Sequence, residues 1–149
     1  MAKAGKNDDN TSRRHLLVGW WALLVFVGLG IVLEAMHGLK IGWYLDLANE
    51  TRRLTWRLAH AHGALFSLVN LAYAFTLDRL GGPKDSWVTL ASRCLLAATI
   101  LLPGGFLLGG ISIHGGDPGV GIFLAPVGGL FFFAAIFLIA RGVTRSKSA

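Results

Sequence analysis

The stretch LLVGWWALLVFVGLGIVL at residues 16–33 carries no charged side chain, and as a helix it is roughly long enough to cross the ~30 Å hydrocarbon core of a bilayer. Three more stretches without Asp, Glu, Lys or Arg follow it, at residues 58–77, 94–113 and 120–140. A backbone in lipid has to satisfy its own hydrogen bonds, and these stretches lack the polar alternation of a barrel strand. The sequence therefore predicts an all-α integral membrane protein, built as an up-down-up-down bundle of four helices.

The overall composition agrees with a membrane protein. Of the 149 residues, 54% are hydrophobic and 15% are charged, whereas about a quarter of the residues in a globular domain are charged. The formal net charge is +6, but the Lys and Arg residues lie beside the apolar stretches. We therefore expect the lipid bilayer with its anionic lipids as the partner, and no nucleic acid. The single cysteine, Cys94, excludes an internal disulfide and a CxxC pair.

The charged residues between the apolar stretches set the expected boundaries. We expect a disordered, basic and polar N-tail at residues 1–14, a four-helix transmembrane domain at 15–142 and a basic C-tail at 143–149. The predicted spans within the domain cover residues 16–36, 57–78, 90–112 and 119–141.

Lys and Arg are unequally divided between the two sides of this bundle. Ten of them lie in the two tails and in the middle connection with its flanks, four lie in the first connection, and the third connection has none. The positive-inside rule therefore predicts a multi-pass protein of the inner (plasma) membrane with cytoplasmic N- and C-termini.

The first connection is the exception to this charge bias, because it ends in the three arginines Arg52, Arg53 and Arg57. The arginines lie among apolar and aromatic residues: Trp43, Tyr44, Leu47, Leu54 and Trp56. Such a composition is typical of a segment in the headgroup layer, where arginines can meet phosphates. We therefore predict an interfacial segment between helices 1 and 2.

Four of the five histidines fall on the outer side of the predicted bundle, with Glu34 one helical turn before the first of them. They are His37 at the end of the first span, His60 and His62 at the start of the second, and His114 after the third. Neutral imidazoles joined by a carboxylate suit a transition metal. The sequence predicts a metal set of Glu34, His37, His60 and His114 and a cofactor set of His60 and His62, without specifying which metal or whether haem is bound.

The two histidines of the second span cannot easily share one ion, because residues two apart on a helix point about 200° apart. His60 lies on a stripe of small and weakly polar residues that fit a bundle interior: Ala64, Ser67, Leu71 and Ala74. We expect His60 to point inward, toward Glu34 and His37, and His62 to point elsewhere. One alternative stays open, in which the histidines bond to headgroups or carbonyls and Glu34 pairs with an arginine such as Arg57.

Residues 61–66, Ala-His-Gly-Ala-Leu-Phe, resemble the haem-ligating H-G-x-x-M helix of haem-copper oxidase subunit I, with Phe66 at the methionine position. This resemblance covers one helix of four and implies that His62 faces a haem. Four short spans with an acidic residue in the first also resemble small multidrug transporters. In general form the chain is similar to uncharacterised small four-helix bacterial inner-membrane proteins.

The last two spans carry small residues four positions apart: Gly105 and Gly109 in the third, and Gly121, Ala125 and Gly129 in the fourth. Small residues at this spacing allow two helices to approach closely in a membrane. We therefore expect the third and fourth spans to pack against each other. Asn70, in the middle of the second span, is predicted to donate a hydrogen bond to another helix.

The chain has no G-x-S-x-G elbow, no phosphate-binding G-x-x-x-x-G-K-[ST] and no H-E-x-x-H, so we do not expect an enzyme. Three functions remain. The first is a non-enzymatic accessory or structural membrane component, in a homo-oligomer or a larger membrane complex. The second is a haem- or metal-binding redox or sensor protein that uses the outer His/Glu cluster. The third is a small transporter with a polar path from that cluster past Ser67 and Asn70 toward Asp78. We take the first as the working hypothesis.

Overall fold

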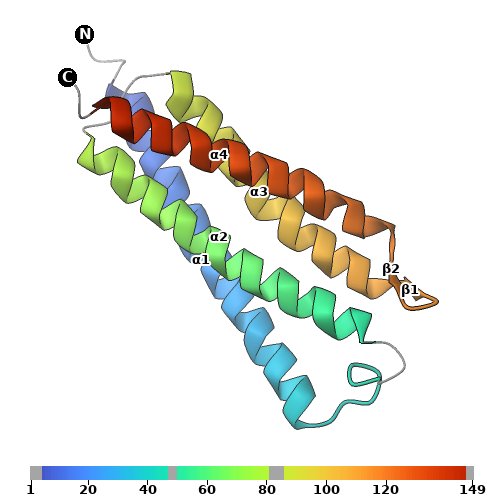
Figure 1. Ribbon diagram of the computed structural model, residues 1–149. Helices are drawn as coiled ribbons and strands as arrows, with labels where there is room; N and C mark the ends of the chain where they lie inside the picture. Colours follow the sequence, from blue (N-terminus) through green and yellow to red (C-terminus); the bar gives the residue numbers. More distant parts are fainter. Residues whose placement is uncertain (1–4, 47–49, 81–85, 147–149) are drawn as a thin grey trace.

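The computed structural model describes residues 5–46, 50–80 and 86–146 of the chain. These residues form four long helices, a short 3-10 helix and two strands of two residues each (Figure 1): α1 Gly5–Gly38, α2 Thr51–Arg79, α3 Ser86–Ile111, β1 Ile113–His114, β2 Asp117–Pro118, η1 Val120–Phe123 and α4 Leu124–Ser146. Each long helix has the length and the apolar composition needed to cross a membrane. The predicted all-helical fold with four candidate spans is therefore confirmed.

The four helices form a row in which each packs on its neighbour in the sequence, α1 on α2, α2 on α3 and α3 on α4 (Figure 1). The start of α1 and the end of α4 lie at one end of the row, which we call the basic end, and the β1–β2 hairpin lies at the other, which we call the hairpin end. Arginines gather at the basic end: Arg13, Arg14, Arg79, Arg93, Arg141 and Arg145.

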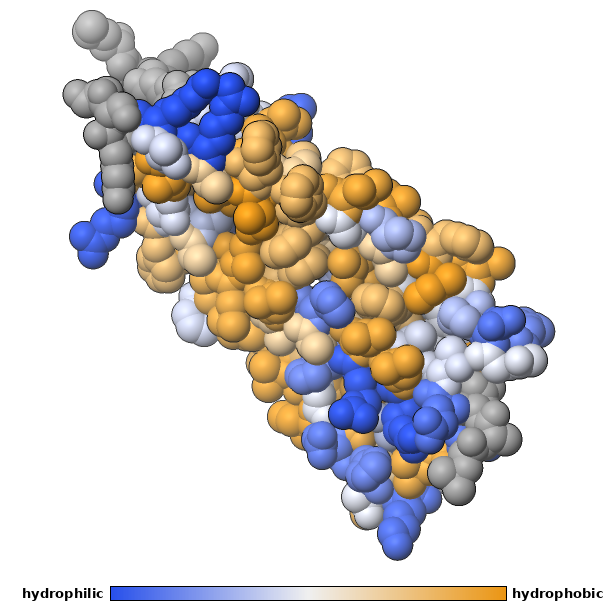
Figure 2. Space-filling view, viewed as in Figure 1, coloured by the Kyte–Doolittle hydropathy of each residue, from blue (hydrophilic) through white to orange (hydrophobic). Residues whose placement is uncertain are grey.

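The outer helices of the row, α1 and α4, bury much less of their apolar surface than α2 and α3. Trp20 on α1 is 60% exposed and Leu130 on α4 is 73% exposed. Figure 2 shows one face of this apolar surface, lying between two more hydrophilic ends. An exposed apolar surface of this extent is typical of a protein that contacts a membrane or a partner.

Glycines allow α3 and α4 to approach each other closely, as their spacing predicts. A Cβ atom at Gly105 would lie 2.5 Å from the backbone nitrogen of Ala125, and one at Gly121 would lie 3.0 Å from the backbone carbon of Leu108. Gly128, outside the predicted stripe, makes the close contact with Leu102 that was expected at Gly129. Because backbone atoms cannot move aside as a side chain can, any larger residue here would separate the helices. At these positions the small residues serve packing within the chain.

Helix α1 begins at Gly5, well before residue 16, so residues 5–14 are helical where we expected the N-tail. Contacts with α2 explain the longer helix: Ser12 Oγ donates to Asp78 Oδ1 at 2.6 Å, and His15, one turn later, is fully buried. At the other end of the chain, α4 continues to Ser146, past the expected end of the span at residue 141. Residues 1–4 and 147–149 of the expected tails lie outside the described residues.

The predicted interfacial segment is divided between a turn and the first turns of α2. Helix α2 begins at Thr51, so its first turns include all three arginines of the cluster, while Leu47 lies outside the described residues. Tyr44 in the turn is 2% exposed and stacks on Trp56 of α2, with ring centroids 6.4 Å apart. Burial raises the pKa of the Tyr44 hydroxyl above its ordinary value.

Arg52 joins this turn to the end of α3. Its Nε donates to the carbonyl of Gly110 at 3.1 Å, and its Nη1 donates to the carbonyl of Trp43 at 3.1 Å. A cation at the C-terminal end of a helix also interacts favourably with the helix dipole. This arginine is therefore bonded within the protein, and at the hairpin end it stabilises the contact of α2 with the preceding turn and with the end of α3.

Candidate functional site

A cluster of polar side chains lies buried where α1, α2 and α3 meet. His15 of α1 has no exposed surface, and its Nδ1 lies 2.6 Å from Asn70 Oδ1 of α2 while its Nε2 lies 2.8 Å from Ser92 Oγ of α3. Asn70 Nδ2 donates to Thr99 Oγ1 of α3 at 2.9 Å. We call His15, Asn70, Ser92 and Thr99 the buried polar network. It joins three helices through their side chains.

The partners of Asn70 fix the direction of the bonds to His15. The carbonyl of Phe66 can only accept, and it lies 2.8 Å from Asn70 Nδ2, so the amide nitrogen faces Phe66 and the amide oxygen faces His15. His15 consequently donates from Nδ1. In its neutral form the ring then accepts at Nε2 from the Ser92 hydroxyl. Both nitrogens of the ring are therefore satisfied.

Further hydrogen bonds complete the network at both ends. Arg14 Nη2 donates to Ser92 Oγ at 2.5 Å, and Thr99 Oγ1 donates to the carbonyl of Leu95 at 2.8 Å. The donors therefore follow one direction. Arg14 donates to Ser92 and Ser92 to His15; His15 then donates to Asn70, Asn70 to Thr99, and Thr99 to the carbonyl of Leu95. Hydrogen bonds in such a series polarise one another, and a fully satisfied buried network favours one arrangement of the core.

Three contacts around the network join α2 to α1 and to α3. The ring of Tyr73 lies edge-on to His15, with centroids 4.8 Å apart and an interplanar angle of 85°, and its hydroxyl donates to the carbonyl of Val88 at 2.8 Å. Ser12 donates to Asp78, as described above. Together they place the buried polar network within a tightly packed junction.

Sequence reasoning identified one member of the network and missed its centre. Asn70 was predicted to donate a hydrogen bond to another helix, which its bond to Thr99 confirms. His15 was overlooked because it follows Arg13 and Arg14 and has the appearance of a basic flank. The available signal was the presence of three small polar residues, Asn70, Ser92 and Thr99, in otherwise apolar stretches, since each needs a partner.

The two histidines of the second span face different helices. His60 Nδ1 donates to the carbonyl of Phe26 on α1 at 2.7 Å. His62 Nδ1 donates to the carbonyl of Leu58, in its own helix, at 2.8 Å, and its ring lies 5.3 Å from that of Phe106 on α3. Because a carbonyl only accepts, Nδ1 holds the proton in both rings, and Nε2 has the lone pair in the neutral form.

A groove of about 790 Å³ separates α1 and α2 toward the hairpin end. Its walls are apolar except for three ionisable side chains: Glu34, Arg57 and His60. The structure thus brings Glu34 and His60, two members of the predicted metal set, to one groove. The only ion pair within the described ranges joins Arg53 to Glu50 at 2.7 Å, so Glu34 and Arg57 share the groove without a direct pair.

The other two members of the predicted metal set do not line this groove. His37 is exposed at the end of α1, and His114 lies opposite Asp117 in the β1–β2 hairpin. Across the part of the chain that the structure describes, no three His, Cys, Asp or Glu side chains gather as a metal site would require. The metal set of Glu34, His37, His60 and His114 therefore stays a prediction, and so does the cofactor set of His60 and His62.

An aromatic ring separates the groove from the buried polar network. Phe26 of α1 lies directly against Gly63 of α2, in the space that a Cβ atom on Gly63 would occupy. Gly63 stands between His60 and Asn70, which are about 15 Å apart along the helix axis. The transporter hypothesis predicts a continuous polar path between these two positions, and it stays a prediction.

Comparisons with known proteins identify no family for this chain. No protein-family model, curated protein or solved structure matches the chain. The function is therefore inferred from the contacts of the chain's own residues. The resemblance of residues 61–66 to a haem-ligating helix implies that His62 faces a haem, whereas its ring lies against the aromatic rings of Phe66 and Phe106.

Proposed function

We propose that the chain is a non-enzymatic accessory or structural component of the inner (plasma) membrane, an up-down-up-down bundle with both ends in the cytoplasm. The buried polar network carries this proposal. Its members, polar side chains within apolar helices, bond to one another and join three helices, which is how polar residues hold a membrane bundle together. A group that acts on a substrate would instead keep a donor or acceptor turned toward a cavity.

The surface of the molecule supports the membrane part of the proposal. The exposed apolar side chains of α1 and α4 would contact lipid or a partner subunit, and the arginines of the basic end would lie at the cytoplasmic headgroups. The hairpin end, where Arg52 is bonded to carbonyls of the protein, would then face outward.

Single cysteines test the orientation. In a Cys94→Ala background, Asp117→Cys would place a thiol at the hairpin end and Thr144→Cys one at the basic end. We expect a membrane-impermeant maleimide added to intact spheroplasts to label the first variant, and to label the second only after lysis. Labelling of Thr144→Cys in intact spheroplasts would contradict the cytoplasmic placement.

Native mass spectrometry of complexes released from native membranes tests the accessory role. We expect a mass above that of one 16.0 kDa chain, either as several copies or as a complex with another subunit. The mass distinguishes these two cases directly. A single chain without any bound protein, released under conditions that preserve other membrane complexes, would contradict an accessory role.

One observation favours a second candidate, a cofactor-binding protein. The bond from His60 Nδ1 to the Phe26 carbonyl is the type of support that orients a metal-ligating histidine, and it leaves Nε2 as the ligand nitrogen beside the groove. An optical spectrum with metal analysis of the detergent-purified protein distinguishes the two functions. A Soret band or a stoichiometric metal lost in His60→Ala and kept in His62→Ala would replace the accessory role with this one.

A further inference from the structure

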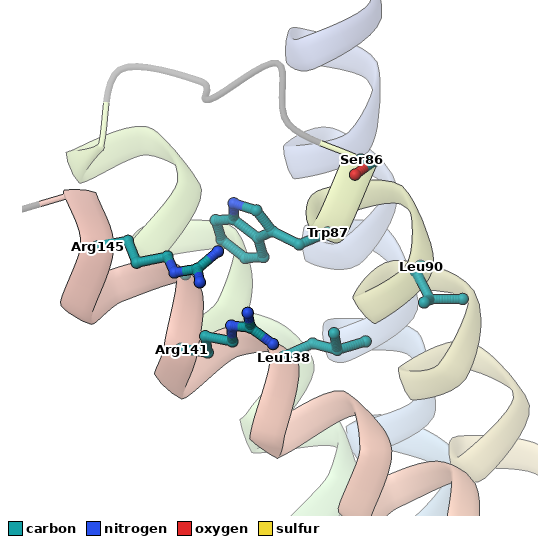
Figure 3. A pocket seen from close by; sticks show the side chains of 7 residues that line it. Ser86, Trp87, Leu90, Leu138, Arg141 and Arg145 are labelled. Carbon is teal, nitrogen blue, oxygen red and sulfur yellow. The ribbon is translucent and has the colours of Figure 1, made fainter.

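A second groove lies at the basic end, between α3 and α4, and has a volume of about 490 Å³ (Figure 3). Its lining residues come from the first turns of α3 and the last turns of α4: Ser86, Trp87, Leu90, Leu138, Arg141, Gly142 and Arg145. None of these lining residues belongs to α1 or α2, and none is a member of the buried polar network.

Gly142 positions the indole of Trp87 in this groove. A Cβ atom on Gly142 would lie 2.5 Å from Cε2 of the indole, so only glycine lets the ring rest against α4. Arg141 and Arg145 are four residues apart on α4 and therefore lie on the same side of that helix. Figure 3 shows both guanidinium groups turned toward the indole.

The two arginines have no carboxylate partner among the described residues, since the one ion pair there, Arg53–Glu50, lies at the hairpin end. Two adjacent positive charges repel each other, and an anion placed between them would relieve that repulsion. Guanidinium groups bind phosphate oxygens in pairs, with good geometry for both donors. Charge complementarity therefore indicates a phosphate as the ligand.

The remainder of the groove is apolar and leads away from the basic end. Leu90, one turn after Trp87, is 52% exposed, and Leu138 lies one turn before Arg141 on the facing helix. A cationic mouth followed by an apolar wall matches a ligand with an anionic head and a hydrocarbon tail. A tryptophan at the boundary is typical of the membrane interface.

We propose that this groove binds one anionic phospholipid of the cytoplasmic leaflet. Arg141 and Arg145 hold its phosphate, the Trp87 indole lies at the glycerol level, and Leu90 and Leu138 contact the first part of an acyl chain. The inference rests on the proposed function in one respect, the cytoplasmic placement of the basic end. It goes beyond a general attraction to anionic lipids, because it assigns a site.

Native mass spectrometry of the full purified chain tests the site, with phosphatidylglycerol and phosphatidylcholine supplied in separate titrations. We expect wild-type protein to bind one phosphatidylglycerol preferentially. The double variant Arg141→Gln, Arg145→Gln should bind it about 30-fold more weakly, because each arginine near an anionic headgroup contributes roughly a fivefold gain in affinity. Binding of phosphatidylcholine should not change.

A matched control removes two other exposed arginines of the basic end, Arg13→Gln and Arg79→Gln, and so lowers the net charge equally. We expect it to keep the wild-type preference for phosphatidylglycerol. Equal losses in the two double variants would show attraction to the whole basic end and would overturn the site. An unchanged preference in the Arg141, Arg145 variant would overturn it as well.

A third titration adds inorganic phosphate to wild-type protein that already carries phosphatidylglycerol. If millimolar phosphate displaces the bound phosphatidylglycerol from wild-type protein, the groove is a site for free anions and the lipid assignment is wrong; lack of displacement supports the lipid. The cysteine labelling described above separates the two proposals. Cytoplasmic Thr144→Cys with no selective lipid binding would reject the groove alone, whereas external Thr144→Cys would reject the proposed orientation.

Discussion

The histidines at the two ends of the molecule are bonded differently. At the basic end, His15 uses both ring nitrogens in hydrogen bonds and has no exposed surface. Toward the hairpin end, His60 and His62 are half-buried, and each bonds to the described residues through Nδ1 alone. The same side chain thus has two roles in one bundle. Where three helices meet, histidine is a cross-link between them. Beside the groove between α1 and α2, His60 makes a single bond to α1 and none at Nε2 among the described residues.

The largest expected effect comes from removing the cross-link. His15→Leu removes the donor to Asn70 Oδ1 and the acceptor of the Ser92 hydroxyl proton, so we expect the free energy of unfolding to fall by about 2–4 kcal/mol. His60→Leu removes one bond at a half-buried position and should cost about 1 kcal/mol or less. Denaturant unfolding of both variants in the same detergent measures the difference. Equal losses would remove the distinction between the two ends.

A second variant tests the ring that separates the two ends. Phe26→Ala removes the side chain packed on Gly63, so the groove should extend toward Ser67, which is fully buried. In a Cys94→Ala, Ser67→Cys background we expect a small charged thiol reagent to react only when Phe26→Ala is present. The variant should also lose about 1–3 kcal/mol of stability. Rapid reaction of Ser67→Cys with Phe26 intact would show that the path is already open.

A smaller effect is expected at the hairpin end, where Arg52 bonds two carbonyls with one planar group. Arg52→Lys keeps the charge but cannot reach both acceptors in the same geometry, so we expect a loss of about 1 kcal/mol. Arg53→Lys provides the matched control, because Arg53 forms an ion pair with the exposed Glu50 and such pairs contribute about 0–1 kcal/mol. Unfolding measurements that rank Arg53→Lys above Arg52→Lys would contradict this role.

The smallest effect concerns Tyr44, whose pKa is raised by burial in the turn before α2. The folded protein keeps this proton to a higher pH than the unfolded chain, which loses it near pH 10. The contribution to stability is therefore fully present below that pH and decreases as the pH rises above it. We expect stability to decline less steeply between pH 9.5 and 11 in Tyr44→Phe than in wild-type protein, as measured by unfolding at each pH. Parallel curves of stability against pH for the two proteins would contradict this contribution of Tyr44.

The fold could be predicted from the sequence to the extent that hydrophobicity determines it. Four uncharged stretches predicted the four long helices, and the small residues of the last two spans predicted the close contact between α3 and α4. The early start of α1 could not be predicted, because residues 5–14 are polar and their helix depends on tertiary bonds from Ser12 and His15.

The candidate site was harder to predict because it also depends on contacts between residues that are far apart in the sequence. His15 stands at the predicted start of the transmembrane domain, directly after Arg13 and Arg14, and its partners Asn70 and Ser92 are 55 and 77 residues away in the sequence. Helical periodicity correctly separated the directions of His60 and His62, because that depends on one helix alone. Whether Glu34, His37 and His114 approach His60 depends on how far α1, α2 and the hairpin separate, which a single sequence does not determine.

A double-mutant cycle between His15→Leu and Asn70→Leu tests most directly whether the buried polar network holds the helices together. Each single variant leaves a polar partner unsatisfied, whereas the double variant replaces both by apolar groups. We therefore expect the double variant to lose less stability than the sum of the two single variants, with a coupling of about 1–3 kcal/mol. Additive losses would show that His15 and Asn70 act independently and would contradict the central claim.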